Sequence, residues 1–268
     1  TGNFDRPGGQ IPEKSTFYDM PAGYNMYEHE YYLDVQPDRK HDAIGCRRFP
    51  LWSKFMDEFQ AMDFSRQILE GTPYPIKAVY GAGMNAKIFP DTQRMYEALK
   101  TLDFFVDVDL FMTDTAKYAD IVLPACTSYE RGEFKAYMGG YATFTKPVIE
   151  PLYESKSDVQ ILKELADVMD LDDKLLREGY EAEINYMIRD LSVTIEDMKA
   201  SDLPIKVPEA REVVPGEFTK NGMNTASGKF EFYSNYIAEF KDMGLSPIPT
   251  WHETLDDEGM DREEYPFI

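Results

Sequence analysis

The pattern of apolar and polar residues predicts a parallel β-sheet in the middle of the chain. Three apolar runs have the length of buried strands: residues 76–80, 104–108 and 121–123. Pro124 ends the third run, because proline cannot donate to a sheet ladder. A stretch with helical spacing begins at Pro90 and ends near Leu102, and a short polar turn and helix cover residues 113–119. This β-α-β-α-β order predicts a Rossmann-like parallel sheet with right-handed crossovers.

Further helices are predicted before and after these strands in the sequence. Residues 53–69 carry apolar positions at helical spacing, and a Gly-Thr-Pro-Tyr-Pro sequence follows them as a break. Ser155 or Ser157 can cap a helix with five buried apolar side chains: Val159, Leu162, Leu165, Ala166 and Met169. A second helical region covers residues 173–198. Residues 228–233 alternate in polarity, which predicts a strand outside the parallel sheet.

These elements indicate an α/β protein organised in three parts. We expect residues 1–70 to form the irregular and helical tail of a preceding domain, and residues 71–200 to form an α/β domain with flanking helices. Residues 201–268 are expected to be a connector that contains a strand and returns to another domain. Because the chain begins in a turn-like sequence and ends in a strand-like one, we expect it to be an internal piece of a longer protein.

Composition excludes several classes of function. The 268 residues carry 28 Lys and Arg against 49 Asp and Glu, a net charge of −21, which repels nucleic acids and anionic membrane surfaces. Cys46 and Cys126 are far apart, and the three histidines lack ligand spacing, so we predict no metal or iron–sulfur site within the chain. No apolar run is long enough for a membrane span. The acidic zones 150–183 and 256–264 are interpreted as solvated surface, and a partner-docking platform over 155–200 is the alternative.

Candidate binding residues follow the ends of the predicted strands. The loops 81–89, 109–115 and 124–132 are expected to meet at the carboxyl edge of the sheet, where parallel α/β sheets bind ligands. Asp109 and Asn85 lie on that edge. A carboxylate there can accept two hydrogen bonds from a planar pair of donors, such as the N1–H and amino group of guanine.

The same edge contains weaker signals. Thr113 and Thr115 are candidates for ribose or phosphate contacts, and helix capping is an equal alternative for Thr113. Asp120 is interpreted as a hydrogen-bonding turn residue. The loop 81–86, Gly-Ala-Gly-Met-Asn-Ala, formally matches a dinucleotide fingerprint, but the predicted helix begins only at Pro90, which disfavours NAD. We find no nucleophile with a base, no paired carboxylates and no phosphate loop, so we predict no catalytic residue.

The sequence of residues 107–134, DVDLFMTDTAKYADIVLPACTSYERGEF, resembles a segment of the molybdopterin oxidoreductases, the family of dimethyl sulfoxide reductase and formate dehydrogenase. Shorter similarities occur in the family's order: TGNFDRPGG at 1–9, GAGMNA at 81–86, TASGKFEFYS at 225–234 and EYPF at 264–267. The resemblance thus extends over nearly the whole chain, and it is strongest over residues 76–151.

The resemblance implies a function for the predicted edge of the sheet. In this family two pterin guanine dinucleotides hold a molybdenum or tungsten ion, and the matching loops approach one guanosine end. Carried over by position, this implicates Gly83, Asn85, Asp109 and Thr113 in cofactor binding. The family's metal ligand, its N-terminal iron–sulfur part and its C-terminal cofactor domain have no counterpart in these residues. We therefore expect a middle fragment that is inactive alone and binds the cofactor weakly or not at all.

Two departures from the family pattern concern the cofactor contacts. Ala86 replaces the usual proline, and residues 132–140 lack the Asn, Glu and Arg of the family's continuation, which indicates a divergent subfamily. The expected partners are the remaining domains of a bacterial or archaeal parent enzyme, and an electron-transfer subunit is a further candidate. A free-standing Rossmann-like NAD-binding domain is the alternative function. Substrate and localisation are not determined by these residues.

Overall fold

The computed structural model describes residues 3–10, 44–45, 48–52, 59–137, 140–210, 214–223 and 225–251. Two compact units divide the chain: the first combines Thr1–Gln10 with Pro215–Ile268, and the second is Ile11–Val214. The predicted boundaries near residues 70 and 200 stay a prediction.

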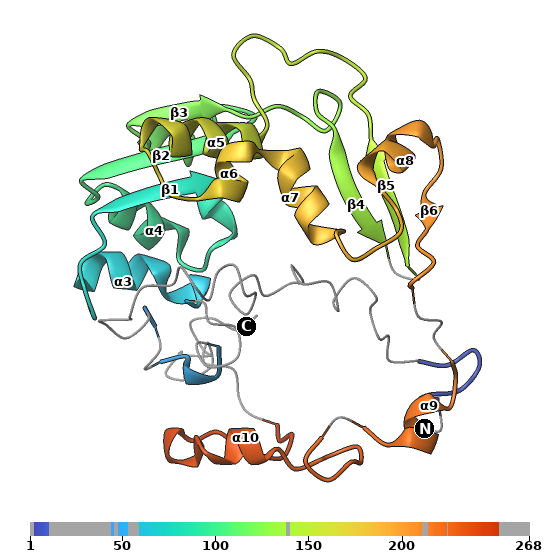
Figure 1. The fold of residues 1–268 in the computed structure, drawn as a ribbon. Helices are drawn as coiled ribbons and strands as arrows, with labels where there is room; N and C mark the ends of the chain where they lie inside the picture. The colour runs from blue at the N-terminus through green and yellow to red at the C-terminus, as the bar shows by residue number, and fades with distance from the viewer. Residues whose placement is uncertain are drawn as a thin grey trace. The chain divides into compact units, whose positions relative to one another are not determined.

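The second unit contains the predicted parallel sheet. Its strands are β1 (Ala78–Ala82), β2 (Phe104–Asp109) and β3 (Ile121–Pro124), and they lie in the order β1-β2-β3 with both pairs parallel (Figure 1). The first strand runs to Ala82 and not from Ile76 to Tyr80, because Gly81 and Ala82 still pair with Asp107 and Val108. This confirms the α/β class and all three strand positions to within two residues.

Helices cover this sheet and form its core. They include the short helices η2 (Ala61–Asp63), η3 (Ala86–Ile88) and η4 (Ala116–Tyr118), and the α-helices α3 (Phe64–Glu70) and α4 (Thr92–Leu99). One core cluster is formed by Met95 and Leu99 of α4 with Phe105 of β2 and Ala86. Helix α3 confirms the end of the predicted helix 53–69, whose residues 53–58 lie outside the described part. Asp91 caps α4 and so fixes its start next to the predicted Pro90.

Helix α5 (Asp158–Val168) begins at Ser157, one of the two predicted caps, whose side chain accepts a hydrogen bond from the Gln160 N–H. Its predicted buried face is mostly wrong. Ala166 is buried, but Leu162, Leu165 and Met169 are 38%, 37% and 59% exposed, and Ile161 is buried instead. At 3.6 residues per turn, the exposed Leu162, Leu165 and Met169 lie between Ile161 and Ala166, so the described part of this unit leaves the middle of the apolar stripe of α5 uncovered.

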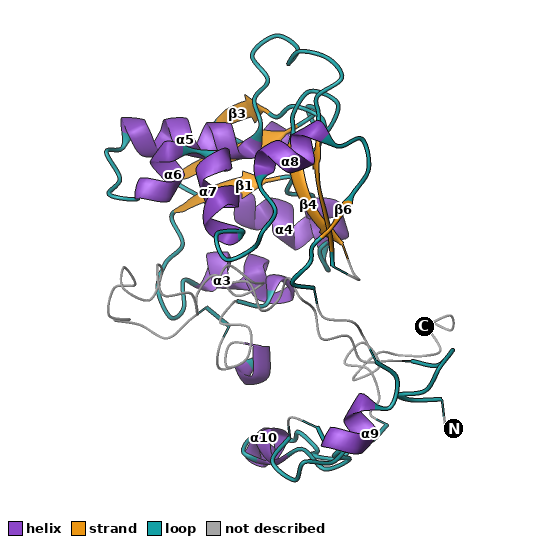
Figure 2. Ribbon diagram, turned by 45° about the vertical axis from the view of Figure 1, so that its right-hand side comes forward, coloured by secondary structure: helices purple, strands orange, loops and turns teal. Residues whose placement is uncertain are grey.

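A second sheet, antiparallel, follows the first and was not predicted. Its strands are β4 (Glu133–Tyr137), β5 (Tyr141–Thr145) and β6 (Ile205–Lys206), in the order β4-β5-β6. The helices α6 (Lys174–Glu178), α7 (Tyr180–Met187) and α8 (Ile195–Ala200) lie within the predicted helical region 173–198 or at its end (Figure 2). Ile184, Ile195 and Met198 of α7 and α8 are fully buried against Ala142 and Phe144 of β5.

The first unit consists of turns and short helices: α9 (Glu217–Asn221), α10 (Asn235–Ala238) and η5 (Lys241–Met243). Asp5 is buried and accepts hydrogen bonds from the N–H groups of Gly216 and Thr219, which fixes the start of α9. The predicted strand 228–233 is wrong, because these residues form bends with no ladder partner among the described residues. No helix in the described part of the chain combines the length and the apolar character that a membrane span requires.

Candidate functional site

The three predicted loops meet at the carboxyl edge of the parallel sheet. A cleft of about 400 Å³ opens there, and it is lined by residues from all three loops and from the start of α5: Gly83, Val108, Asp109, Leu110, Ala125, Cys126, Thr127, Ser128, Arg131 and Asp158. Two of the four predicted binding residues, Gly83 and Asp109, therefore lie in one cleft. Asn85 and Thr113 do not line it.

The first loop is held close to β2 by its backbone. The Gly83 N–H donates to the carbonyl oxygen of Val108 at 2.8 Å, and the Gly83 φ angle of +60° lies in the left-handed region that favours glycine. A Cβ on Gly81 would lie 3.3 Å from Asp107 Oδ1, so this position also requires a close approach to β2. The two glycines thus let the loop turn directly over the strand end.

Asn85 has a structural role at this edge. Its Oδ1 accepts a hydrogen bond from the Lys87 N–H at 3.1 Å and caps η3. Only a single 3₁₀ turn begins at Ala86, and α4 begins at Thr92 with its own cap from Asp91. The α-helix that a dinucleotide fingerprint directs at a pyrophosphate is therefore absent from the end of this loop.

Asp109 is the last residue of β2, and one of its carboxylate oxygens accepts a hydrogen bond from the loop that follows. Oδ1 accepts from the Leu110 N–H at 2.6 Å, while Oδ2 has only a 3.5 Å contact from the Thr113 hydroxyl. Oδ2 therefore retains most of its capacity to accept hydrogen bonds from a ligand. The Thr113 oxygen accepts from the Ala116 N–H at 3.1 Å, which is the capping alternative.

Two other predicted polar residues of this region are structural. Thr115 is 1% exposed, so the expected contact with ribose or phosphate is wrong for this side chain. Its hydroxyl oxygen accepts instead from the Ala86 N–H at 2.9 Å. Asp120 is the predicted hydrogen-bonding residue: its Oδ2 accepts from the Phe105 N–H at 2.7 Å and ties β3 to the start of β2.

Asp107 lies beneath the site and was not singled out from the sequence. It is fully buried, and neither carboxylate oxygen has a hydrogen-bond partner within the described part of the chain. Burial, with a contribution from the negative charge of Asp109, raises the pKa of the Asp107 carboxyl to about 6.

The third loop is fixed by two charged residues that sequence reasoning did not identify. Glu130 is 6% exposed and accepts hydrogen bonds from the N–H groups of Thr127 and Leu152, each at 2.7 Å. The Thr127 and Leu152 N–H groups lower the pKa of the Glu130 carboxyl to about 2. Arg131 donates to the Cys126 carbonyl oxygen at 2.7 Å and to Glu133 Oε1 at 2.8 Å. Both residues lie in the segment 107–134 that resembles the family, but neither was singled out as a site residue.

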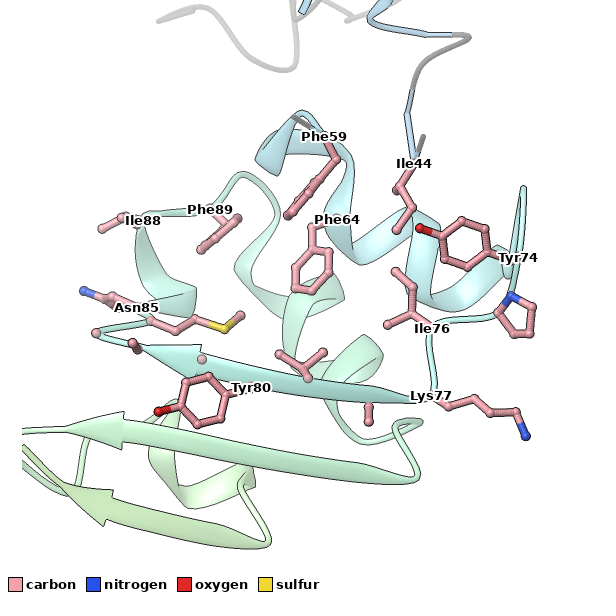
Figure 3. Close-up of a pocket in the computed structure, with 17 residues that line it drawn as sticks. Ile44, Phe59, Phe64, Tyr74, Ile76, Lys77, Tyr80, Asn85, Ile88 and Phe89 are labelled. Carbon is pink, nitrogen blue, oxygen red and sulfur yellow. The ribbon is translucent and has the colours of Figure 1, made fainter. Parts of the chain in front are cut away.

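A larger apolar groove of about 690 Å³ runs along β1, on the edge that does not pair with β2. Figure 3 shows Phe59, Phe64 and Phe89 grouped above the strand and Asn85 at the end of the groove. The lining is mainly aromatic and aliphatic, so it offers few groups that orient a polar ligand. Two predicted site residues, Gly83 and Asn85, line this groove, and Gly83 also lines the cleft at the end of β2.

The cleft offers hydrogen-bond acceptors and open backbone to a ligand. Asp109 supplies an oxygen with unused hydrogen-bond acceptor capacity. Gly83 lines the same cleft, and a Cβ built on it would have no atom within 4 Å. Among the described residues, no group of three or more His, Cys, Asp or Glu side chains can hold a metal ion.

Comparisons with known proteins agree with the resemblance. Residues 60–168 match the family Molybdopterin oxidoreductase. The chain is 32% identical over 218 residues to the Probable oxidoreductase YoaE of Bacillus subtilis, with 78% of this chain and 30% of that protein covered. It is 29% identical over 301 residues to the Dimethyl sulfoxide reductase DmsA of Haemophilus influenzae, with 100% of this chain and 36% of that protein covered.

A solved structure is similar as well. The acetylene hydratase from Pelobacter acetylenicus superposes with a TM-score of 0.63 at 27% identity, over 78% of this chain and 29% of that one. The chain thus spans about a third of the length of these proteins. From these matches and the fold, the chain belongs to the molybdopterin oxidoreductase family.

Proposed function

We propose that this chain is part of a larger molybdenum- or tungsten-dependent oxidoreductase and holds the guanosine end of one molybdopterin guanine dinucleotide. The observation that supports this function best is the position of Asp109. Its carboxylate ends the central strand β2, lines the cleft beside Gly83 and has an oxygen with unused acceptor capacity. Family membership is the second support.

The chemistry of Asp109 selects for guanine. The N1–H and the 2-amino group of guanine form a planar donor pair, and one carboxylate can accept from both. Adenine presents an acceptor at N1, so the same carboxylate would face a lone pair and lose this interaction. The backbone of Gly83, without a side chain, leaves room for the ribose next to the base.

Catalysis is assigned to other parts of the parent enzyme. When bound, the cofactor supplies the redox chemistry of its metal, and the residues of this chain bind and orient one nucleotide end. In this proposal the cleft forms only one wall of the complete cofactor site. We therefore expect the chain alone to be inactive and to hold the complete cofactor weakly or not at all. Its partners in this proposal are the remaining domains of the enzyme and an electron-transfer subunit.

The test uses the complete enzyme that contains this chain, purified with its cofactor. In D109N the amide nitrogen replaces one acceptor, so we expect the guanine nucleotide to dissociate about tenfold faster or more. The measurement is the GMP released per polypeptide by acid hydrolysis, before and after dialysis. The control is D103N, which alters an exposed carboxylate just before β2, at the opposite edge of the sheet. Equal GMP content and equal dissociation rates in D109N and the unmodified enzyme would contradict the proposal.

The NAD-binding alternative is separated by a titration of the chain with NAD and with GDP. A micromolar, selective affinity for NAD would refute the guanine assignment. Tight, stoichiometric binding of the whole pterin dinucleotide by the chain alone would refute the claim that it forms only one wall of the site.

A further inference from the structure

Two loops of the candidate site are joined by a buried hydrogen bond. The hydroxyl oxygen of Thr115 accepts from the N–H of Ala86 at 2.9 Å, across 29 positions of sequence. Thr115 closes the loop that carries Asp109, and Ala86 directly follows the loop that carries Gly83 and Asn85. The bond therefore links the two segments that the proposed function assigns to one ligand.

Both partners of this bond are inaccessible to solvent. Ala86 is 0% exposed and Thr115 is 1% exposed, so water cannot replace the bond if it is lost. The Ala86 methyl group also belongs to the core cluster with Met95, Leu99 and Phe105. The end of the first loop is thus fixed on one side by apolar packing and on the other by Thr115.

The other connections between these loops are weaker or more general. Lys87 and Asp114 form an exposed ion pair between the same loops, and exposed pairs contribute little to a fixed geometry. The backbone bond from Gly83 to Val108 holds the loop to the strand but does not reach the loop 109–115. Of these connections, the bond to the Thr115 hydroxyl is the one that joins both loops through a buried side chain.

We propose that Thr115 is a positioning residue: its hydroxyl holds the Gly83–Asn85 segment at the distance from Asp109 at which a guanosine fits between them. The inference rests on the proposed function. Since the side chain is buried, it acts through the Ala86 N–H and does not touch the nucleotide. Asp107, which is buried below the same loop without a hydrogen-bond partner, offers no substitute tie within the described residues.

The experiment compares T115V, T115S and the unmodified complete enzyme by two measurements. The first is hydrogen–deuterium exchange of the peptide that contains Ala86, which reports the bond itself. The second is the rate at which guanine nucleotide is lost on dialysis. Valine keeps the shape of threonine but removes the acceptor, so we expect both rates to rise about tenfold in T115V. Serine keeps the hydroxyl, so T115S should restore both rates to within about twofold of the unmodified enzyme.

A matched control separates positioning from a general loss of stability. The Thr145 hydroxyl in β5 also accepts a backbone hydrogen bond, from the Glu133 N–H at 3.1 Å, but lies outside the cleft. T145V should leave the nucleotide loss rate unchanged. Faster exchange at Ala86 without faster nucleotide loss in T115V would overturn the inference and leave the proposed function intact, as would equal nucleotide loss in T115V and T145V. Absence of guanine nucleotide from the unmodified enzyme would overturn both.

Discussion

Asp107 makes the stability of this chain depend on pH in an unusual direction. Asp107 is fully buried in the central strand β2, where it pairs with Gly81 of β1 and Val122 of β3 in the sheet register. Neither oxygen has a hydrogen-bond partner in the described part of the chain, and Asp109 adds a negative charge nearby. The neutral acid is therefore favoured in the folded state, and burial raises the pKa of Asp107 from 3.8 to about 6.

The sign and size of the effect follow from linkage. A raised pKa means that the folded chain holds this proton more tightly than the unfolded chain does. The contribution of Asp107 to the unfolding free energy therefore falls as pH rises from about 4 to about 6, and stays low above that range. The shift from 3.8 to about 6 corresponds to an upper limit of about 3 kcal/mol.

The perturbation is D107N, which keeps the shape of the side chain and removes its ionisation. We expect D107N to match the unmodified chain at pH 4 and to be more stable by up to about 3 kcal/mol at pH 7. The assay is urea unfolding followed by circular dichroism from pH 4 to pH 8. Other carboxyl groups titrate over the same range, but those that do not interact with Asp107 cancel in the difference between the two proteins.

D103N serves as the matched control, because Asp103 is exposed and lies just before the same strand. Its unfolding free energy should stay parallel to that of the unmodified chain throughout. The reasoning would be refuted if the difference between D107N and the unmodified chain were the same at pH 4 and pH 7. That result would mean that Asp107 is solvated or paired in the folded protein.

Three further perturbations test the packing and hydrogen bonds around the site. E130Q should lower the melting temperature at pH 7. The difference in melting temperature between E130Q and the unmodified chain should shrink as pH falls from about 4.5 to about 2, because the stability that the depressed pKa of Glu130 provides is lost when the carboxylate is protonated. A difference that stays constant with pH would contradict this. G132A should destabilise by about 1–3 kcal/mol in urea unfolding, since its Cβ would lie 2.5 Å from Phe144 Cε1; an unchanged midpoint would contradict that contact. I184A should lower the free energy of unfolding by about 2–5 kcal/mol, because Ile184 is fully buried in the core of the second sheet. A decrease below about 1 kcal/mol would show that this core can collapse around the cavity.

The parallel sheet was predictable because its determinants are local. Each strand is a short apolar run with Gly, Pro or Asp at its end, and these residues limit the strand wherever it lies in the fold. The antiparallel sheet lacks such signals. In β5 only Ala142 and Phe144 are buried in the core, and the surface that buries them comes from α7 (Tyr180–Met187) and α8 (Ile195–Ala200), much further along the chain. Two inward side chains do not distinguish a strand from a loop until that surface is in place.

In the candidate site, too, the residues that local sequence identifies differ from those whose roles depend on distant partners. Asp109 and Asn85 were identified by the rule that loops at the carboxyl ends of parallel strands meet, and Gly83 by the family resemblance. The cleft contains Gly83 and Asp109 but not Asn85. Thr115 and Glu130 were not assigned their roles, because these depend on partners 29 and 22 positions away. Thr113, which caps its own turn, and Thr115, which accepts a hydrogen bond from a second loop, lie two positions apart in the same local sequence. Only the tertiary contact separates them.

The segment 228–233 shows why alternation alone does not predict a strand. Phe230 and Phe232 alternate with polar residues, and their rings lie 5.3 Å apart, so the pattern does place them together. The rings remain 59% and 77% exposed, and the backbone forms bends. Alternation specifies which side chains share a face, whereas a strand also requires a neighbour that pairs with its N–H and C=O groups. Within the described residues that neighbour is missing, and Glu231 instead accepts a hydrogen bond from the Ser227 N–H at 2.8 Å, which closes a local turn.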